Sequence, residues 1–319
     1  TTDANIDTTG QRNLTITGEL DAATLDISGD ADIDGTTNLD VVDIDGAVDM
    51  ASTLTVAGNV SIDGGTIKLD GNYPTGTRNL AYGNTALDDG SLSGADNVAI
   101  GHAALTANTS GASNTAVGSK SLQANTTAGS STAVGNCALA TNITGSLNTA
   151  VGVSSMRYNT TGSQNAGFGV NALEANTEGD NNTAVGVSAL GTNTTADNNT
   201  AVGHSALTAN TTGAGNVAVG AITGDAITTG SNNVALGYEA AGKLTTGGDN
   251  VAVGRAALLD TTTQSGNVAI GVEALENNTA DENVAVGKQA LNDNTSGSVN
   301  VAIGSYALSK NTTAGGHTA

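Results

Sequence analysis

Asn97-Val98-Ala99-Ile100-Gly101 opens a five-residue pattern, Asn-Thr/Val-Ala-Val/Ile-Gly, that returns along the chain until Asn300-Val301-Ala302-Ile303-Gly304. The glycines that close it lie 17 residues apart, except for one interval of 18 and one of 16. They are Gly83, Gly101, Gly118, Gly135, Gly152, Gly169, Gly186, Gly203, Gly220, Gly237, Gly254, Gly271, Gly287 and Gly304. A spacing kept over so many copies indicates one structural unit stacked on itself.

The three residues before each of these glycines have the pattern of a short strand. Branched residues flank an alanine, so they point to one side and the alanine to the other. Glycine then allows a sharp turn with positive φ. We therefore expect an all-β fold: a parallel β-solenoid (β-roll) of about fourteen 17-residue coils. We expect both strand faces to be buried, one inside the coil and one against neighbouring chains, so that Ala218→Phe blocks assembly.

Most coils continue with a leucine four residues after the glycine and an asparagine seven residues after it. The leucine and the small residue before it fit a single helical turn or a bent second strand. Asparagine tolerates the left-handed region and bonds its own backbone, so it marks a second corner. Stacked coils lie about 4.8 Å apart, which predicts two ladders of asparagine amides. The alternative is that Asn108-Thr109-Ser110, Asn125-Thr126-Thr127 and Asn193-Thr194-Thr195 are glycosylation acceptors.

The composition indicates a fibrous protein rather than an enzyme. The chain has 44 Gly, one Pro, no Trp and 2% aromatic residues, so its coils can enclose only a thin core. Its net charge is −21, and a homotrimer would carry 3 × −21 = −63, which repels nucleic acid and anionic membranes. No stretch of 18 apolar residues or secretion signal is present, so we expect no membrane insertion. We expect both ends to continue in a longer protein.

Residues 1–71 follow a different rule, in which an alternating apolar pattern ends in glycine, as in Leu14-Thr15-Ile16-Thr17-Gly18. These patterns recur irregularly and carry little apolar surface. We interpret 1–71 as an N-terminal β-structured shaft segment, an intertwined three-chain stalk. The single proline, Pro74, lies where the two rules meet. Residues 72–78 are therefore assigned as a linker and 79–319 as the solenoid domain.

Two groups of residues have the types that could bind a metal ion. Asp30-Ala31-Asp32-Ile33-Asp34-Gly35 matches the first half of a calcium loop, but the twelfth position is Val41 instead of Glu, and a strand with a solvated acidic face explains the same alternation. Asp43 and Asp45 repeat the pattern. His102 and His204 each follow a coil-closing glycine, but six coils separate them by about 29 Å. We predict no metal site.

The sequence shows no catalytic or cofactor-binding motif. Cys137 stands where other coils have Lys120 or Ser154, with no base beside it in the coil, and one cysteine cannot form an intrachain disulfide. No recurrent Ser-His-carboxylate set or phosphate-binding glycine loop is present. We predict no active site and no cofactor.

One coil departs from the pattern, because Gly224 and Ile227 replace its leucine and asparagine. The next two coils have Leu244 and Thr261 at the asparagine position. This change could mark a kink, a lateral contact with a partner, or sequence drift.

The Asn-x-Ala-Val/Ile-Gly strand resembles the repeat of trimeric autotransporter adhesin heads, which are left-handed β-rolls. The longer unit, Asn-Thr-Ala-Val-Gly-x-x-Ala-Leu-x-x-Asn-Thr-Thr-Gly, resembles repeats of bacteriophage tail fibres. The resemblance covers residues 79–319 and implies a homotrimeric, virion-associated shaft. Such a shaft would join other tail or baseplate proteins and extend a tip, outside this chain, that binds a host cell-surface receptor.

Two alternatives follow from the same residues. The first is the head of a trimeric adhesin on a bacterial cell surface. The second is a polysaccharide-cleaving spike, which would need clustered carboxylates and aromatic platforms. The six Tyr and Phe residues, scattered along the chain, do not supply such platforms.

Overall fold

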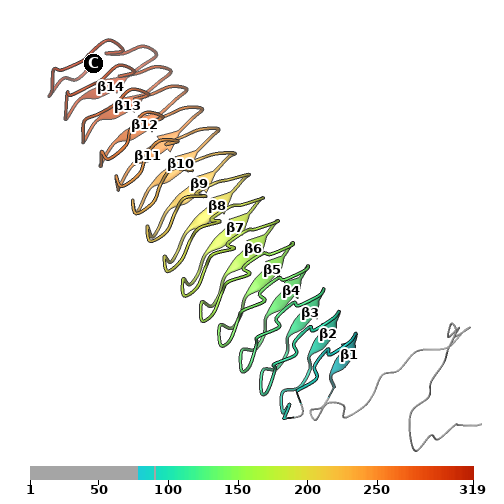
Figure 1. The fold of residues 1–319 in the computed structure, drawn as a ribbon. Helices are drawn as coiled ribbons and strands as arrows, with labels where there is room; N and C mark the ends of the chain where they lie inside the picture. Colours follow the sequence, from blue (N-terminus) through green and yellow to red (C-terminus); the bar gives the residue numbers. More distant parts are fainter. Residues whose placement is uncertain (1–77, 90) are drawn as a thin grey trace, which may run out of the picture. The chain divides into compact units, whose positions relative to one another are not determined.

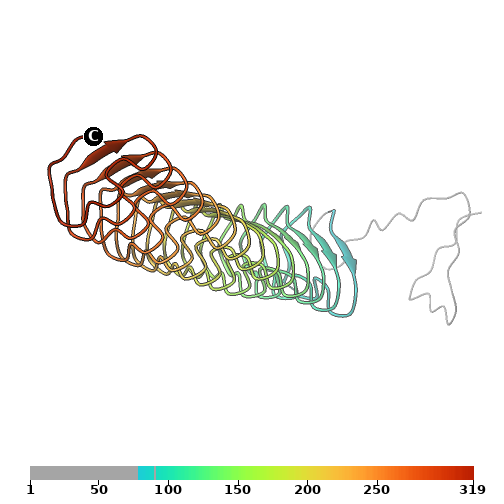
Figure 2. The ribbon, with the colours of Figure 1, turned by 90° about the horizontal axis from the view of Figure 1, so that it is seen from above.

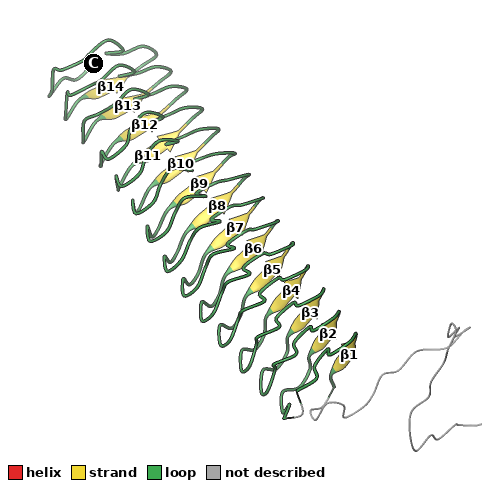
Figure 3. Ribbon diagram, in the orientation of Figure 1, coloured by secondary structure: helices red, strands yellow, loops and turns green. Residues whose placement is uncertain are grey.

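The described part of the chain, residues 78–89 and 91–319 of the computed structural model, consists of strands and turns only. Fourteen three-residue strands form one parallel sheet, in which the strand order follows the sequence (Figures 1 and 3). The predicted shaft, the acidic motif that begins at Asp30, and the linker apart from Arg78 lie outside the described residues. The prediction of an all-β parallel β-solenoid is confirmed.

The strands follow the five-residue pattern. They are β1 (Leu80–Tyr82), β2 (Val98–Ile100), β3 (Thr115–Val117), β4 (Thr132–Val134), β5 (Thr149–Val151), β6 (Ala166–Phe168), β7 (Thr183–Val185), β8 (Thr200–Val202), β9 (Val217–Val219), β10 (Val234–Leu236), β11 (Val251–Val253), β12 (Val268–Ile270), β13 (Val284–Val286) and β14 (Val301–Ile303).

Equivalent residues of successive coils lie directly beside one another. Ala201 of β8 pairs with Ala218 of β9, and the same register holds between every two neighbouring strands. Figure 2 shows each coil as a loop that repeats the path of the one before it. Fourteen strands are joined by thirteen coils, and thirteen steps of about 4.8 Å give about 62 Å of rod.

The 18-residue and 16-residue intervals change the length of the turns and leave the strand pairing unchanged. Leu80 still pairs with Val98 across the 18-residue interval, and Val268 still pairs with Val284 across the 16-residue interval. In the shorter coil the Asn278 amide reaches the carbonyl two residues ahead instead of three. The second corner therefore tolerates a change of length that the strands do not.

The coil-closing glycines occupy a conformation that other residues rarely adopt. Their φ angles lie between +130° and +139°. In addition, a Cβ atom on Gly186 would lie 2.4 Å from the carbonyl oxygen of Gly203 in the next coil. Both the local conformation and the close stacking of coils thus require glycine.

After the glycine the chain forms neither the helical turn nor the bent strand that the sequence suggested. In nearly every coil two non-glycine residues have left-handed φ angles, as at Ala103 (56°) and Leu105 (51°), and in one coil Gly224 takes the second of these positions. A third precedes the first asparagine, as at Asp96 (60°). The amide of Leu105 donates to the carbonyl of Ser121 in the next coil (3.1 Å). Bonds between coils therefore hold a conformation that is unfavourable for isolated residues.

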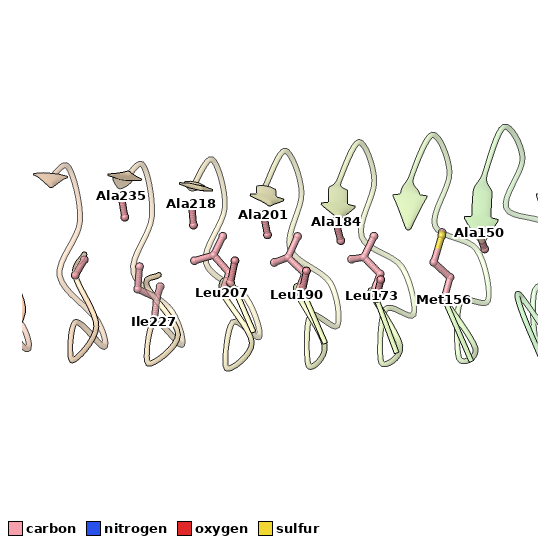
Figure 4. Packing of buried hydrophobic residues seen from close by; sticks show 14 of the residues in the cluster. Ala150, Met156, Leu173, Ala184, Leu190, Ala201, Leu207, Ala218, Ile227 and Ala235 are labelled. Carbon is pink, nitrogen blue, oxygen red and sulfur yellow. The ribbon is translucent and has the colours of Figure 1, made fainter. Parts of the chain in front are cut away.

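The core of each coil contains the strand alanine and one large aliphatic side chain. Figure 4 shows Ala184, Ala201 and Ala218 pointing toward the side of the coil that carries Leu173, Leu190 and Leu207. All of these side chains are fully buried. The branched residues face outward and are partly exposed, so they, and not the alanines, are the side chains available to neighbouring chains. Burial of the outward face against such chains stays a prediction, whereas the prediction that Ala218 lies on the assembly face is wrong. Ala218→Phe would disrupt the coil itself instead of assembly.

Departures from the core pattern compensate one another. In one coil Met156 replaces leucine (Figure 4), and the strand residue that lies against it is Gly167 instead of alanine. A Cβ on Gly167 would lie 3.1 Å from the Met156 Cγ atom. Likewise, the buried Ile227 lies only 3.0 Å from where a Cβ on Gly224 would stand, so it occupies the space of the missing leucine. The chain conserves interior volume, and β9 and β10 remain in register through the unusual coil.

Of the two predicted asparagine ladders, the one that follows the leucine is confirmed. The Asn142 amide donates to the Asn125 side-chain oxygen (3.1 Å), and the Asn159 amide donates to that of Asn142 (2.7 Å). Each amide also donates to the main-chain carbonyl three residues ahead, as from Asn159 to Gly162 (2.8 Å). These asparagines do not have positive φ, so the expected left-handed corner is wrong.

The ladder that precedes the strand is confirmed in part. The side-chain amides of Asn97, Asn233 and Asn250 donate to the asparagine oxygen of the neighbouring coil (3.2, 3.1 and 3.1 Å), but most bonds of this column come from main-chain amides. The main-chain amide of Asn165 donates to the Asn148 side-chain oxygen (2.9 Å), and the Asn148 amide donates to the Gly162 carbonyl (2.7 Å). Gly162 thus accepts a hydrogen bond from both columns, since Asn159 donates to it as well. Both columns are buried, so Asn108, Asn125 and Asn193 cannot accept a glycan in the folded chain.

We expect Gly186→Ala to destabilise the solenoid by about 1–3 kcal/mol or more, because alanine would have an unfavourable φ and would meet the next coil. Gly191→Ala is the matched control. Its φ is not positive, a Cβ there would lie no closer than 3.2 Å to a neighbouring atom, and Ala140 already occupies the equivalent position. It should cost less than about 1 kcal/mol. Urea unfolding measures both values, and equal losses would contradict the role given to Gly186.

We expect Asn193→Leu to cost about 2–4 kcal/mol, because it overfills a coil that already contains Leu190 and leaves the Asn176 oxygen without its donor. The double variant Leu190→Ala, Asn193→Leu reproduces the arrangement at Ala241 and Leu244. It should recover the packing part of the loss while the hydrogen-bond part remains. A double variant that is less stable than Asn193→Leu would contradict the volume rule.

Candidate functional surface

The outward residues of the sheet form a continuous surface along the rod. We call the first and third residues of the strands β1–β14 the strand stripe. Because side chains alternate along each strand, the buried middle residue forces its two neighbours outward. Exposure within the stripe is substantial for large side chains, such as Phe168 (41%), Val219 (40%) and Ile303 (65%).

The strand stripe contains no charged residue. Fourteen strands contribute two outward residues each, and only five of these residues are polar, all of them threonine. The chain as a whole has 30 Asp and Glu and a net charge of −21. A solvated sheet face usually carries charged side chains, which also prevent edge and face association. An uncharged stripe of this length is therefore the candidate interaction surface of the described residues.

The aromatic residues lie on the surface. The structure describes five of the six, and all five are at least 41% exposed. Tyr82 and Phe168 belong to the strand stripe, and Tyr238 directly follows a coil-closing glycine next to it. Glu239 accepts a hydrogen bond from Tyr238 and raises the pKa of that phenol. Exposed aromatic side chains on an apolar surface are typical anchors of protein interfaces.

The residues considered for chemistry remain separate. His102 and His204 are exposed corner residues on different coils, and Cys137 is a half-buried thiol on a third coil. Over residues 78–89 and 91–319, no three His, Cys, Asp or Glu side chains are grouped so as to hold a metal ion. Within these same ranges, no helix has the length and apolar character needed to cross a bilayer.

Two further polar columns were not predicted from the sequence. Threonines after the second corner donate to the equivalent residue of the next coil, as from Thr177 to the Thr194 carbonyl (3.0 Å). At another corner the amide of Asp180 donates to the Asp197 carboxylate (2.7 Å). The recurrent threonine after each ladder asparagine was the sequence signal for the first column. Together these columns bond successive coils at the periphery as well as in the interior.

Ion pairs join neighbouring coils at positions outside the strand stripe. Arg78 pairs with Asp96 (2.6 Å), Lys243 with Asp260 (2.6 Å), and Lys310 with Asp293 (2.5 Å). Arg255 also pairs with Glu273. These pairs are largely exposed, so each contributes little to stability. The charged residues of these pairs all lie outside the strand stripe.

Comparisons with protein families, curated proteins and solved structures give no significant match over this chain.

Hydrogen bonds across coils give the solenoid a modest acid sensitivity. The Arg78 guanidinium lowers the pKa of Asp96, and the Lys310 ammonium lowers that of Asp293. Gln289 and then Arg255 lower the pKa of Glu273. A lowered folded pKa stabilises the fold above the ordinary carboxyl pKa, and this contribution is lost as the pH falls through the lowered values.

We therefore predict a nearly constant melting temperature between pH 6 and 8 and a small decrease below about pH 4. Burial raises the pKa of Asp225, so this group acts in the opposite direction and favours the fold once protonated. Arg78→Gln should reduce the acid-dependent decrease. Thermal melts over a pH series measure the effect, and a rise in melting temperature below pH 4 would contradict it.

Proposed function

We propose that residues 79–319 form the rigid shaft of a homotrimeric fibre of the bacteriophage tail-fibre type, in which the strand stripes of three chains pack around a common axis. The observation that carries this proposal is the uncharged apolar stripe along all fourteen strands of a strongly acidic chain. Copies that each carry a charge of −21 can approach closely only through a face without charge.

The stripe offers an extended surface for association. A length of about 62 Å and a width of about 10 Å, from three residues at about 3.3 Å each, give about 600 Å² per chain. Side chains beside the stripe, such as Val153 and Val187, are also exposed and apolar and extend it. Stable interfaces bury about 800 Å² per partner. In a trimer each chain divides the stripe between two neighbours, so the stripe forms the centre of each interface and the side chains beside it supply the rest of the area.

The mechanism of such a shaft is geometric. Each strand bonds to the coils on both sides, and the side-chain ladders add bonds between coils inside and outside the core. Bending the rod would stretch many of these bonds at once. A stiff rod holds a receptor-binding tip at a fixed distance from the particle, joins tail or baseplate proteins at its other end, and needs no catalytic residue, metal or cofactor.

We expect Val219→Glu to abolish trimer formation while the chain keeps its fold, because three carboxylates would be buried around the axis. Thr212→Glu is the matched control, since coil position 212 is equivalent to 178, where Glu178 already stands. Light scattering gives the mass and circular dichroism gives the fold. A monomeric parent chain would contradict the proposal, and so would a Val219→Glu variant that is still trimeric.

The biological assignment requires a separate experiment. An antibody against residues 79–319, viewed by electron microscopy on source material, should label fibres that project from phage tails. Labelling of a bacterial cell surface would instead favour the adhesin head.

A further inference from the structure

Strand β6 differs from its neighbours at both outward positions. It reads Ala166-Gly167-Phe168, whereas β5 and β7 both read Thr-Ala-Val. Ala166 is the smallest outward side chain of the sheet, and Phe168 is larger than any other outward side chain except Tyr82. One strand thus combines a hole and a protrusion on the same face.

The chain itself accounts only for the inner substitution. Gly167 makes room for Met156, as described above. Phe168 lies between Val151 and Val185 in the sheet and still remains 41% exposed. Within the described residues, Met156 thus fills the space left at the middle position of β6. No comparable change in size accompanies Ala166 and Phe168 at the two outward positions.

A closed ring of identical parallel chains brings these two positions together. In a cyclic assembly whose axis runs along the rod, equivalent coils lie at one height and strands run in the same rotational sense. The end of a strand in one copy therefore meets the start of the equivalent strand in the next copy. At the level of β6, Phe168 of one copy would face Ala166 of its neighbour.

Near-identical coils create a problem that such a pair can solve. If one chain slides by one coil along another, it exchanges each stripe residue for one of similar shape, so few contacts distinguish the two registers. We propose that Phe168 and Ala166 act as a knob and hole between copies of this chain and fix the axial register of the assembled fibre. This inference rests on the proposed homotrimer and goes beyond it by naming the residues that align the copies.

Sliding by one coil would place Phe168 against Thr149 or Thr183 of the neighbour instead of Ala166. Both are larger than alanine, so the aromatic ring would meet a filled position while the hole at Ala166 would face a valine and remain partly empty. Steric overlap at Phe168 and an unfilled cavity at Ala166 would both destabilise the shifted register.

Disulfide cross-linking in the full chain tests the register, in a Cys137→Ser background. Thr200→Cys with Val202→Cys places thiols at both ends of β8, and we expect oxidation to give covalent trimers. Thr200→Cys with Val219→Cys reports a shift of one coil. In the aligned assembly an axial offset of about 4.8 Å adds to the lateral separation of the two strand ends, which moves the Cα atoms beyond the limit of about 7 Å for a disulfide. This second pair should cross-link poorly.

Replacement of the knob and hole by the residues of β5 and β7, Ala166→Thr with Phe168→Val, should raise cross-linking of the shifted pair on the order of tenfold, as the steric penalty for sliding disappears. An unchanged cross-linking pattern in a trimer would overturn the register proposal alone. A monomeric parent chain would overturn the assembly and this inference with it.

Discussion

In many of the coils two asparagine side chains donate to one main-chain carbonyl, and this shared acceptor helps to set the register of the solenoid. At Gly162 the donors are Asn148 from one column and Asn159 from the other. Both amides are buried, so an unpaired amide would lose its bond to water without replacement. A chain that slipped by one residue would leave many such groups unpaired at once. The insertion and the deletion in the repeat are accordingly accommodated away from the strands.

The interior obeys a second constraint, which is constant volume. Met156 opposite Gly167, and Ile227 beside Gly224, show that a larger residue at one position is accepted where a neighbour becomes smaller. The outward face is not filled in this way, since it consists of partly exposed, uncharged side chains. The interior of the coil is filled, whereas the outward face exposes uncharged side chains. The proposed function and the proposed register of the fibre both follow from this difference.

Much of the architecture could be predicted from the sequence, because a strict repeat transfers each local inference to every coil. The strands, the glycine corners and the amide ladder through Asn142 follow from spacing and residue type. The inward side of the strand could not be predicted, because alanine and valine are both apolar and only the narrow interior selects alanine. Left-handed φ angles at residues such as Leu105 contradict local preference and depend on bonds between coils. The strand stripe could have been found from its lack of charge.

Hydrogen exchange of the ladder asparagines tests most directly whether the buried columns hold the register of the solenoid. In a chain labelled with 15N at asparagine, nuclear magnetic resonance can follow hydrogen exchange of the side-chain amides of Asn142, Asn159 and Asn176. We expect these amides to exchange only when the solenoid unfolds, orders of magnitude more slowly than free asparagine. Exchange at the rate of a free side chain would show that the columns are solvated and would contradict the register on which the structure depends.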